Sequence, residues 1–568
     1  MRRRSRGGLF LLLLIVLAAW LWRAPACRNG NRPQAGFGVT ISKETTFIEG
    51  PLDERGGVDY LAALNARCSR GVTPENNAAV LLWQAFGPPE IPEPLHRQFC
   101  VTLGMEPLPE EGAYLLSDEK YLEARATGAS DGGEPPDDEA DAANGFYRQL
   151  GRAQGGPWSP EEFPLVAGLL ERNGPALDRV VEATRRPRCH TPLLAEEGNP
   201  LRVLGGLTPL SDRSRDAARQ LTARAMLRLH EGRTQEAWND LLACHRLARL
   251  VGEGPTVIEA MTAYVVGAIA CQAHEALAGP GVLTAEQARA CLRDWEALAP
   301  LPTMAERFDV AGRFMYLDGV VAMSRGPVEL SESLGEQEPA PRPGDAPGAE
   351  LARQLHRALA NAALTAAIDW NEALRVGNRW YDRLVEAVSR PTRRERREAL
   401  ERLEDELDAI RDQTRDPVNL AKSYLRVRSP RTTMGELFGN SLFALVMPSA
   451  EAATDAEDRA QARFDVSRLA FALAAHHAEQ GRYPDRLDEL VPGHLDEIPD
   501  DPFAEESYRF RPGDGGYLLY SVGPNGKDEQ GANYWVDYGD AEPDDIPGDA
   551  DRESDDIAIR IAGPDASS

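Results

Sequence analysis

The sequence has too little positive charge for a protein that binds nucleic acid. Its 568 residues include 63 lysines and arginines against 90 aspartates and glutamates, which gives a net charge of −27. Binding to a phosphate backbone requires clustered lysines and arginines. The composition therefore argues against nucleic acid as a partner and leaves cation binding open. Hydrophobic residues make up 42% of the chain, which is enough for a sizeable core.

Recognisable catalytic motifs are also missing. The chain has no G-x-S-x-G elbow, and the spacing in GPNGKD is too short for a phosphate loop. The segments that begin at His274 and His476 lack the second zinc-binding histidine one turn on. Cys271 lies one helical turn before His274 and near Cys244-His245, but the apolar neighbours favour core thiols and satisfied histidines over a metal site. The sequence thus predicts a protein that is not an enzyme.

The N-terminus lacks an apolar run of the ~20 residues that a membrane-spanning helix needs. Residues 1–27 instead combine a basic stretch, an apolar run at 9–22 and an A-x-A sequence, a pattern typical of export signals. We expect a signal peptide or a short signal-anchor, with the remaining chain in the periplasm or cell envelope. If the segment is not cleaved, residues 9–22 anchor the protein in the inner membrane.

Cysteines are few and irregularly spaced. Six of the seven follow the leader, in a compartment where disulfides can form. Cys244, Cys271 and Cys291 fall within apolar helical patterns, so we predict buried free thiols. A Cys68–Cys100 disulfide stays open as an exception.

Residues 28–454 carry mainly helical signals. Thr73 and Ser159, each followed by proline, are typical N-cap residues, and Thr284 stands in capping-box register. We therefore expect helices to begin at these three positions. Two Pro/Gly/acid-rich segments, 126–145 and 335–349, interrupt the pattern and are expected to be mobile surface loops.

The clearest helical block spans residues 214–298. Apolar residues recur there at helical spacing, and Gly232 separates two antiparallel helices. The stretch ARAMLRLHEGRTQEAWNDLLACHRLA loosely resembles a tetratricopeptide hairpin, without a clean repeat. Trp238, Trp295 and Trp370 also fall at helical spacing and are interpreted as core residues. The body is thus predicted to be an array of helical hairpins.

The sequence pattern of residues 455–568 differs from that of the preceding helical region. An amphipathic helix, with Val466 and Leu473 on one face, is followed by short alternating runs on either side of RPGDGG, which is the pattern of a β-hairpin. We therefore predict a mainly α fold class with a small C-terminal α+β domain.

A series of short motifs gives this domain a family resemblance. In chain order they are Arg482-Tyr483-Pro484, Asp501-Pro502-Phe503, Tyr508-Arg509-Phe510, Gly516-Tyr517, Tyr520-Ser521-Val522-Gly523, Asn525-Gly526 and Asp555-Asp556-Ile557. The order resembles the globular head of the major pseudopilin of type II secretion. The resemblance implies a pseudopilin-like head, a link to a secretion system of this type, and a last loop that binds one Ca²⁺.

The N-terminus departs from that family. With Gly8 as the prepilin cleavage point, Leu13 stands where prepilins have glutamate. Most of the chain also separates the apolar segment from the pseudopilin-like domain. We therefore expect that the protein does not polymerise as a pilin subunit.

The resemblance points to Ser521, Asp528, Asp555 and Asp556 as ligands of Ca²⁺, which prefers six to eight hard oxygens. The alternative is a solvated acidic tail without a specific ion. Taken together, we predict a non-catalytic envelope protein with a structural or protein-interaction role and with protein partners in the cell envelope. The alternative is an envelope enzyme with a site in a groove of the helical body.

Overall fold

The computed structural model describes residues 38–126, 139–196, 201–206, 208–325, 366–415, 429–445, 447–504, 506–534 and 552–562. The expected leader 1–27, with its apolar run at 9–22, and the expected loop at 335–349 lie outside these residues. So does most of the expected loop at 126–145, although residues 139–145 belong to a helix.

The described part of the chain is mostly helical, which confirms the mainly α fold class. The first helices are α2 (Tyr60–Cys68), α3 (Ala78–Phe86), α4 (Glu93–Leu103), α5 (Asp118–Ala126), α6 (Glu139–Gly155), α7 (Pro164–Ala183), α8 (Leu210–His230), α9 (Thr234–Val251) and α10 (Val257–Cys271). They are followed by α11 (His274–Leu277), α12 (Ala285–Glu296), α13 (Met304–Arg307), the π-helix η1 (Phe308–Gly312), α14 (Arg313–Arg325), α17 (Trp370–Val388), α18 (Arg393–Arg415), α20 (Pro430–Phe443), α21 (Met447–Gln480) and the 3-10 helix η2 (Leu487–Leu490).

Helices α8 and α9 form the hairpin expected from the sequence. Gly232 lies between them with φ of 74°, a left-handed conformation that glycine adopts without steric cost. The capping box expected at Thr284 is also present, because its hydroxyl accepts the Gln287 amide at 3.2 Å at the start of α12. Trp238, Trp295 and Trp370 are buried, as expected of core residues.

Two expected helix starts are wrong. Helix α3 begins after Asn77, whose side chain accepts the Ala79 amide at 3.1 Å, and not after Thr73. Helix α7 begins at Pro164, while the Ser159 carbonyl only closes a turn before it. In each case a second residue that suits a helix start follows the first in the chain, Asn77 after Thr73 and Pro164 after Ser159. The helix begins at the later of the two.

A small antiparallel sheet completes the C-terminal part. Strands β3 (Arg509–Gly513), β4 (Gly516–Ser521) and β5 (Ile557–Ile561) lie in the order β3-β4-β5, so the hairpin predicted around RPGDGG is confirmed. Leu519 pairs with Phe510 on one side and with Ile559 on the other. A separate two-residue pair joins β1 (Asp500–Asp501) to β2 (Glu506–Ser507).

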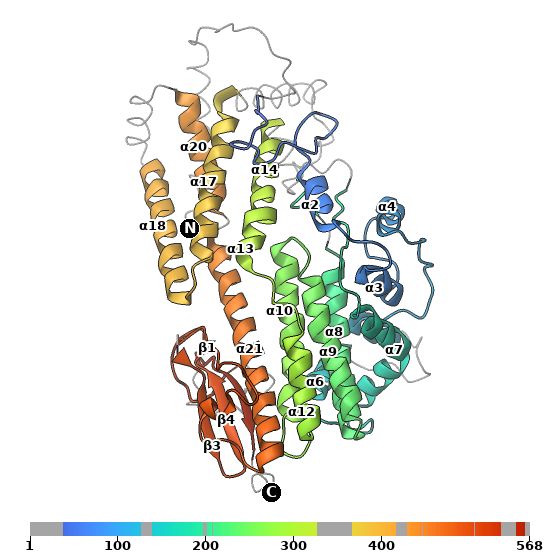
Figure 1. The fold of residues 1–568 in the computed structure, drawn as a ribbon. Coiled ribbons are helices and arrows are strands. Elements are labelled where there is room, and N and C mark those ends of the chain that lie inside the picture. The colour runs from blue at the N-terminus through green and yellow to red at the C-terminus, as the bar shows by residue number, and fades with distance from the viewer. Residues whose placement is uncertain are drawn as a thin grey trace.

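Helix α21 connects the two ends of the molecule. Figure 1 shows it running from the half that contains α17, α18 and α20 to the sheet, which packs against its C-terminal part. The described residues form two hydrophobic clusters, and residues of α21 belong to both. One cluster joins the sheet to α8, α9 and α12, so the sheet shares its core with the helical body.

The six described cysteines are free thiols. Cys244 and Cys291 are buried, as predicted, whereas Cys271 is only partly buried. The disulfide left open between Cys68 and Cys100 does not form.

Candidate functional site

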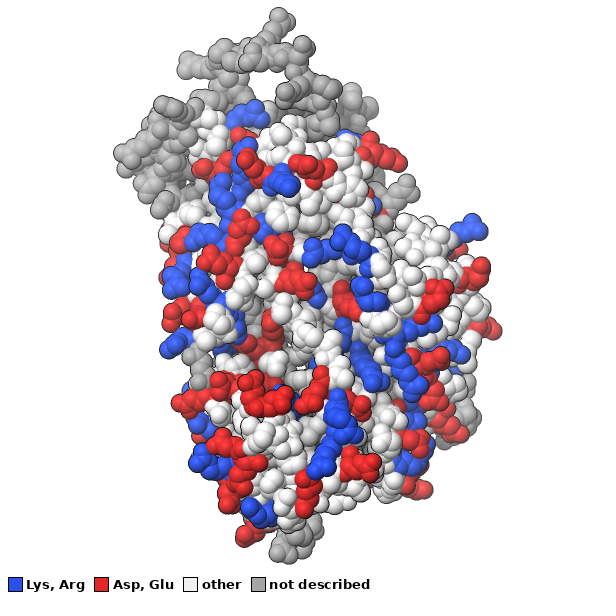
Figure 2. Space-filling view, viewed as in Figure 1, with Lys and Arg blue, Asp and Glu red and all other residues white. Residues whose placement is uncertain are grey.

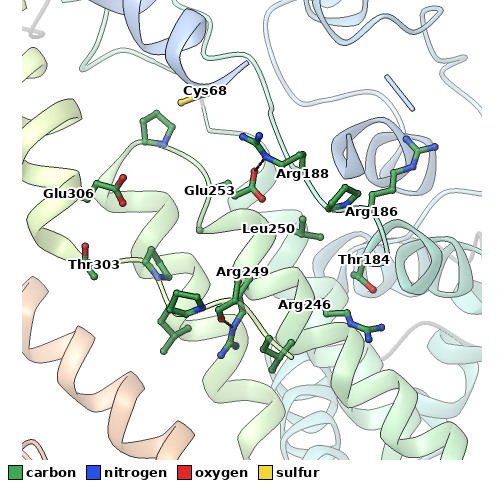
Figure 3. Close-up of a pocket in the computed structure, with 18 of the residues that line it drawn as sticks. Cys68, Thr184, Arg186, Arg188, Arg246, Arg249, Leu250, Glu253, Thr303 and Glu306 are labelled. Atoms are coloured by element: carbon green, nitrogen blue, oxygen red, sulfur yellow. Dashed lines mark hydrogen bonds and ion pairs between the residues drawn. The ribbon is translucent and has the colours of Figure 1, made fainter. Parts of the chain in front are cut away.

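A cleft of about 980 Å³ lies where the C-terminal ends of several helices meet. Its walls come from the end of α2, the segment that follows α7, the end of α9 with the turn after it, the end of α12 with the segment after it, and α13. Figure 3 shows side chains from these segments around the cleft.

The cleft is basic, although the protein is strongly acidic. The lining residues include three carboxylates, Glu253, Asp294 and Glu306, against seven arginines. These arginines are Arg67, Arg185, Arg186, Arg188, Arg246, Arg249 and Arg307. On the face shown in Figure 2, both signs of charge are interspersed, and basic side chains gather near the centre. The cleft therefore concentrates positive charge that the composition alone does not reveal.

Two of the three carboxylates are already paired. Arg188 Nε lies 3.1 Å from Glu253 Oε2, and Arg307 Nη1 lies 3.0 Å from Glu306 Oε2. Among the described residues, no carboxylate lies within ion-pair distance of the other five arginines of the cleft. Arg186 donates to the Pro74 and Asn77 carbonyls, and the remaining four are Arg67, Arg185, Arg246 and Arg249. Arg67 and Arg185 are exposed and Arg246 is half-buried, so the charges of these three are available to an anion.

Arg249 is the most buried of these four. Its Nε donates to the Ala299 carbonyl at 3.1 Å, and the guanidinium lies 4.6 Å from the centre of the Phe464 ring. Burial lowers the pKa of Arg249 to about 10, so the side chain stays charged at neutral pH. Its Nη2 is buried without a hydrogen-bond partner.

Cys68 is a cysteine in the wall of the cleft, but it is not an activated nucleophile. Burial raises the pKa of its thiol to about 11. Reactive cysteines have lowered pKa values, because the thiolate is the nucleophile. Cys68 is therefore a protonated thiol at neutral pH.

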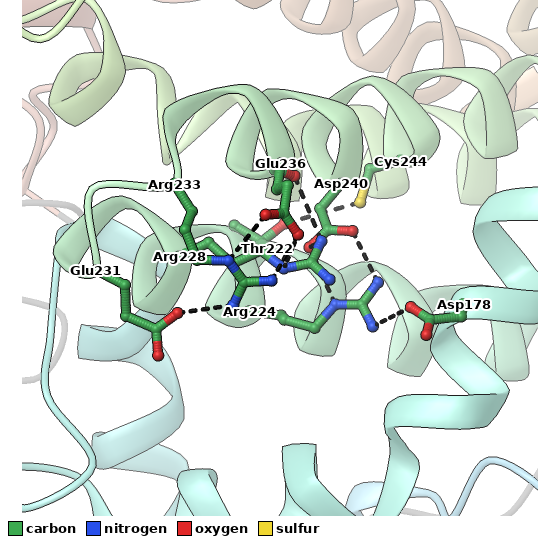
Figure 4. Close-up of polar contacts among 9 residues, drawn as sticks. All are labelled: Asp178, Thr222, Arg224, Arg228, Glu231, Arg233, Glu236, Asp240 and Cys244. Atoms are coloured by element: carbon green, nitrogen blue, oxygen red, sulfur yellow. Dashed lines mark hydrogen bonds and ion pairs between the residues drawn. The ribbon is translucent and has the colours of Figure 1, made fainter.

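A smaller pocket beside the cleft has the opposite character. There Arg224 binds Asp240 through two hydrogen bonds of 3.0 and 2.7 Å, and Arg228 donates to the same carboxylate at 2.6 Å. Asp178 of α7 accepts a further bond from Arg224 at 2.8 Å. Figure 4 shows this network between α7, α8 and α9. Arg224 and Arg228 are paired with carboxylates there, so the network joins helices and offers little charge to a ligand.

The structure places the four residues predicted to bind Ca²⁺ in two settings. The Ser521 hydroxyl donates to Asp501 Oδ1 at 2.8 Å and accepts the Gly523 amide at 3.2 Å. Asp501 also accepts the Val522 amide at 3.1 Å. Ser521 thus supports the turn after β4 through Asp501, a residue that the sequence did not indicate as part of the site.

Asp528, Asp555 and Asp556 gather with Glu529 in the loops beside β4 and β5. Asp528 Oδ1 accepts the Tyr520 hydroxyl at 2.9 Å, and Asp555 Oδ1 accepts the Asn525 amide at 3.3 Å. Glu529 acts electrostatically on both Asp555 and Asp556. Sequence reasoning missed Glu529, although it directly follows Asp528 in KDEQG.

Two carboxylate oxygens in this group have no donor from the rest of the described chain. Asp556 Oδ1 and Glu529 Oε2 are buried, and the two carboxyl groups contact each other, so they are satisfied only by sharing a proton. Burial, with the neighbouring Glu529 and Asp528, raises the pKa of Asp556 to about 7. An unsatisfied buried carboxylate is costly, and a hard cation would satisfy both oxygens. Carboxylate oxygens are ligands that Ca²⁺ prefers, but among the described residues no three of Asp528, Glu529, Asp555 and Asp556 bring ligand oxygens within 4.8 Å of one another.

The cleft thus has the charge to bind an anion, whereas the acidic group has the charge to bind a cation. The two sites also belong to different parts of the fold. The cleft is built by the helical body, and the acidic group by the loops of the sheet. No family model, no curated protein and no solved structure matches the chain.

Proposed function

We propose that the protein is a non-catalytic binding protein of the cell envelope that holds an acidic segment of a protein partner in the arginine-lined cleft. The observation that carries the proposal is the presence of five arginines without a carboxylate partner in one cleft of a chain with a net charge of −27. Carboxylates are abundant in such a chain, so we would expect most arginines to form ion pairs with them.

The size and chemistry of the cleft suit a polypeptide. A volume of about 980 Å³ is at the upper end of the range of small-molecule pockets, and these are mostly apolar. Arginine clusters are a recurrent means of recognising acidic peptide motifs, because guanidinium groups bind carboxylates in a bidentate manner. The overall negative charge disfavours a nucleic acid.

The lining supports binding over catalysis. Among the described residues that line the cleft, there is no histidine, serine or tyrosine, and Cys68 is a protonated thiol. The described lining therefore offers neither an imidazole base nor an activated thiol.

The envelope location rests on the leader at residues 1–27 and on the pseudopilin resemblance of the C-terminal part. A long helix followed by a small antiparallel sheet, as α21 and β3 to β5 form, supports that resemblance. On this basis, the proposed partner belongs to the cell envelope and to a system like type II secretion.

We further propose that one Ca²⁺ stabilises the C-terminal part. The buried pair of carboxyl groups of Asp556 and Glu529, which receives no donor from the rest of the described chain, supports this proposal. Glu529 and Asp556 would hold the ion, which would offset their mutual repulsion.

Binding of a fluorescent, glutamate-rich peptide tests the function of the cleft. We expect saturable binding that weakens with salt, since the contacts are ionic. Replacing Arg67 and Arg246 together by alanine is expected to weaken binding at least ~10-fold, because hydrogen bonds to charged groups contribute about 1.5–3 kcal/mol each.

Arg172→Ala is the matched control, since Arg172 is an exposed arginine of α7 outside the cleft, without an ion-pair partner among the described residues. Equal binding of a glutamine-rich peptide, or equal loss in the control variant, would contradict the proposal.

A further inference from the structure

His245, Cys271 and His274 form a compact cluster of metal-binding side chains apart from the acidic group. One ligand atom from each lies within 4.8 Å of the others. His245 comes from α9, Cys271 ends α10, and His274 begins α11. The turn between α10 and α11 places Cys271 and His274 side by side, and packing of α10 on α9 brings them to His245.

The two histidines are buried without the partners expected of core histidines. Neither residue has any exposed surface. The His245 and His274 Nε2 atoms lie 3.2 Å apart and share one hydrogen bond, while both Nδ1 atoms are buried without a partner. The interpretation as satisfied core histidines is therefore only half correct. Packing holds the rings in place, since Trp295 lies 4.6 Å from the His245 ring and 5.2 Å from the His274 ring, measured between centroids.

The separation of the two Nε2 atoms suits a shared metal ion. With an ion about 2.0 Å from each nitrogen, the N–ion–N angle would be about 105°. A cavity of about 10 Å³ adjoins His245 and Cys271, which is space for about one water molecule or ion. Cys271 is only partly buried, so an ion can reach the cluster from its side.

Charges around the thiol favour a monovalent ion. Arg463 and Arg249 act electrostatically on Cys271, and the Ser467 hydroxyl hydrogen-bonds its thiol. Burial raises the pKa of the Cys271 thiol, and these groups offset only part of that rise. Their positive charges would oppose a divalent cation more strongly than a monovalent one.

We propose that His245, Cys271 and His274 bind one Cu(I) ion. Thiolate and imidazole are ligands that Cu(I) prefers, and three of them suffice for it, whereas structural zinc sites use four. A thiolate and two neutral imidazoles give Cu(I) a complex with no net charge, as burial among aromatic rings requires. On binding, the Cys271 thiol loses its proton to solvent and a Cu–S bond forms, without change in the oxidation state of copper or sulfur.

Anaerobic titration of the full-length protein with Cu(I), in competition with a coloured Cu(I) chelator, tests this site. We expect one copper per chain and an X-ray absorption spectrum with one sulfur and two nitrogen ligands. Cys271→Ser and His274→Gln are each expected to lower the affinity at least ~100-fold, since even changes around metal ligands cost 10–100-fold. Cys244→Ala, which removes a buried thiol of α9 outside the cluster, leaves the affinity unchanged.

Circular dichroism establishes that each variant is folded. The X-ray absorption spectrum is measured on the native protein, so this part of the test does not depend on the folding of a variant. The proposal is overturned if copper does not bind stoichiometrically, if its ligands include no sulfur, or if Cys271→Ser binds copper as the native chain does. One equivalent of Zn²⁺ that Cu(I) cannot displace would overturn the choice of metal.

Discussion

At the scale of single residues, the acidic group near β5 stores unfavourable electrostatic energy. Asp556 is 1% exposed, and its carboxyl group lies against that of Glu529. A carboxyl group whose pKa is higher in the folded state binds protons more tightly there. Its contribution to the free energy of unfolding therefore falls as the pH rises from 3.8, the ordinary value, to about 7.

Asp556→Asn is expected to remove this decrease in the free energy of unfolding with rising pH. In the presence of a chelator, the variant should be more stable than the native protein above pH 7 and equal to it below about pH 4. Calcium should raise the melting temperature of the native protein and leave that of the variant unchanged. Calorimetry between pH 4 and 8 measures both effects, with the exposed Asp514→Asn as control. A full calcium response in Asp556→Asn would refute the site.

Asp240 has a structural role of a different kind, because it neutralises two arginines between α8 and α9. Asp240→Ala leaves Arg224, which is 7% exposed, without its bidentate partner. We expect a loss of about 3–5 kcal/mol in the free energy of unfolding, as for other broken buried ion pairs. Chemical denaturation measures it.

Glu236→Ala is the control for this prediction. Glu236 belongs to the same network, but its side chain is 48% exposed, so the loss should be below about 1 kcal/mol. Similar losses in the two variants would show that burial does not set the strength of the network.

At the scale of elements, helix starts decide how α10 and α12 are positioned. Both begin with a capping box, Thr256 with Glu259 and Thr284 with Gln287. The second box was predicted from the sequence. The first was missed, because the apolar run after Thr256 dominated the pattern, although Thr256 and Glu259 have the required spacing.

Thr256→Ala is expected to destabilise the protein by about 1 kcal/mol, since its hydroxyl accepts the Glu259 amide at 3.2 Å and donates to Glu259 Oε2 at 2.9 Å. Thr256→Ser retains the hydroxyl and should cost only a few tenths of this. Thermal unfolding compares them, and equal stability of the serine and alanine variants would exclude a role for the cap.

At the scale of the whole molecule, α21 makes the sheet and the helical body one folding unit. The sheet lies in the same hydrophobic cluster as α8, α9 and α12, and the other end of α21 lies in the second cluster. We expect the amides of β4 to exchange with solvent no faster than those of α10, because both open only when the shared core unfolds. Hydrogen-exchange mass spectrometry measures this, and early exchange of β4 alone would show a separate domain.

Elements whose signals are local could be predicted from the sequence alone. The hairpin at Gly232, the cap at Thr284 and the strands around RPGDGG follow from residues close together in the chain, so periodicity and turn chemistry were sufficient. Where two local signals competed, as at Thr73 and Asn77, the packing of the helix chose between them.

The sites could not be predicted in this way, because they form only when distant parts of the chain come together. The arginines of the cleft come from the ends of several helices, and none of them stands in a motif. Glu529 contacts Asp556, and His245 contacts His274. The two residues of each pair are too far apart in the sequence for a local pattern to connect them. Charges and ligand atoms act through space, whereas sequence patterns report neighbours along the chain.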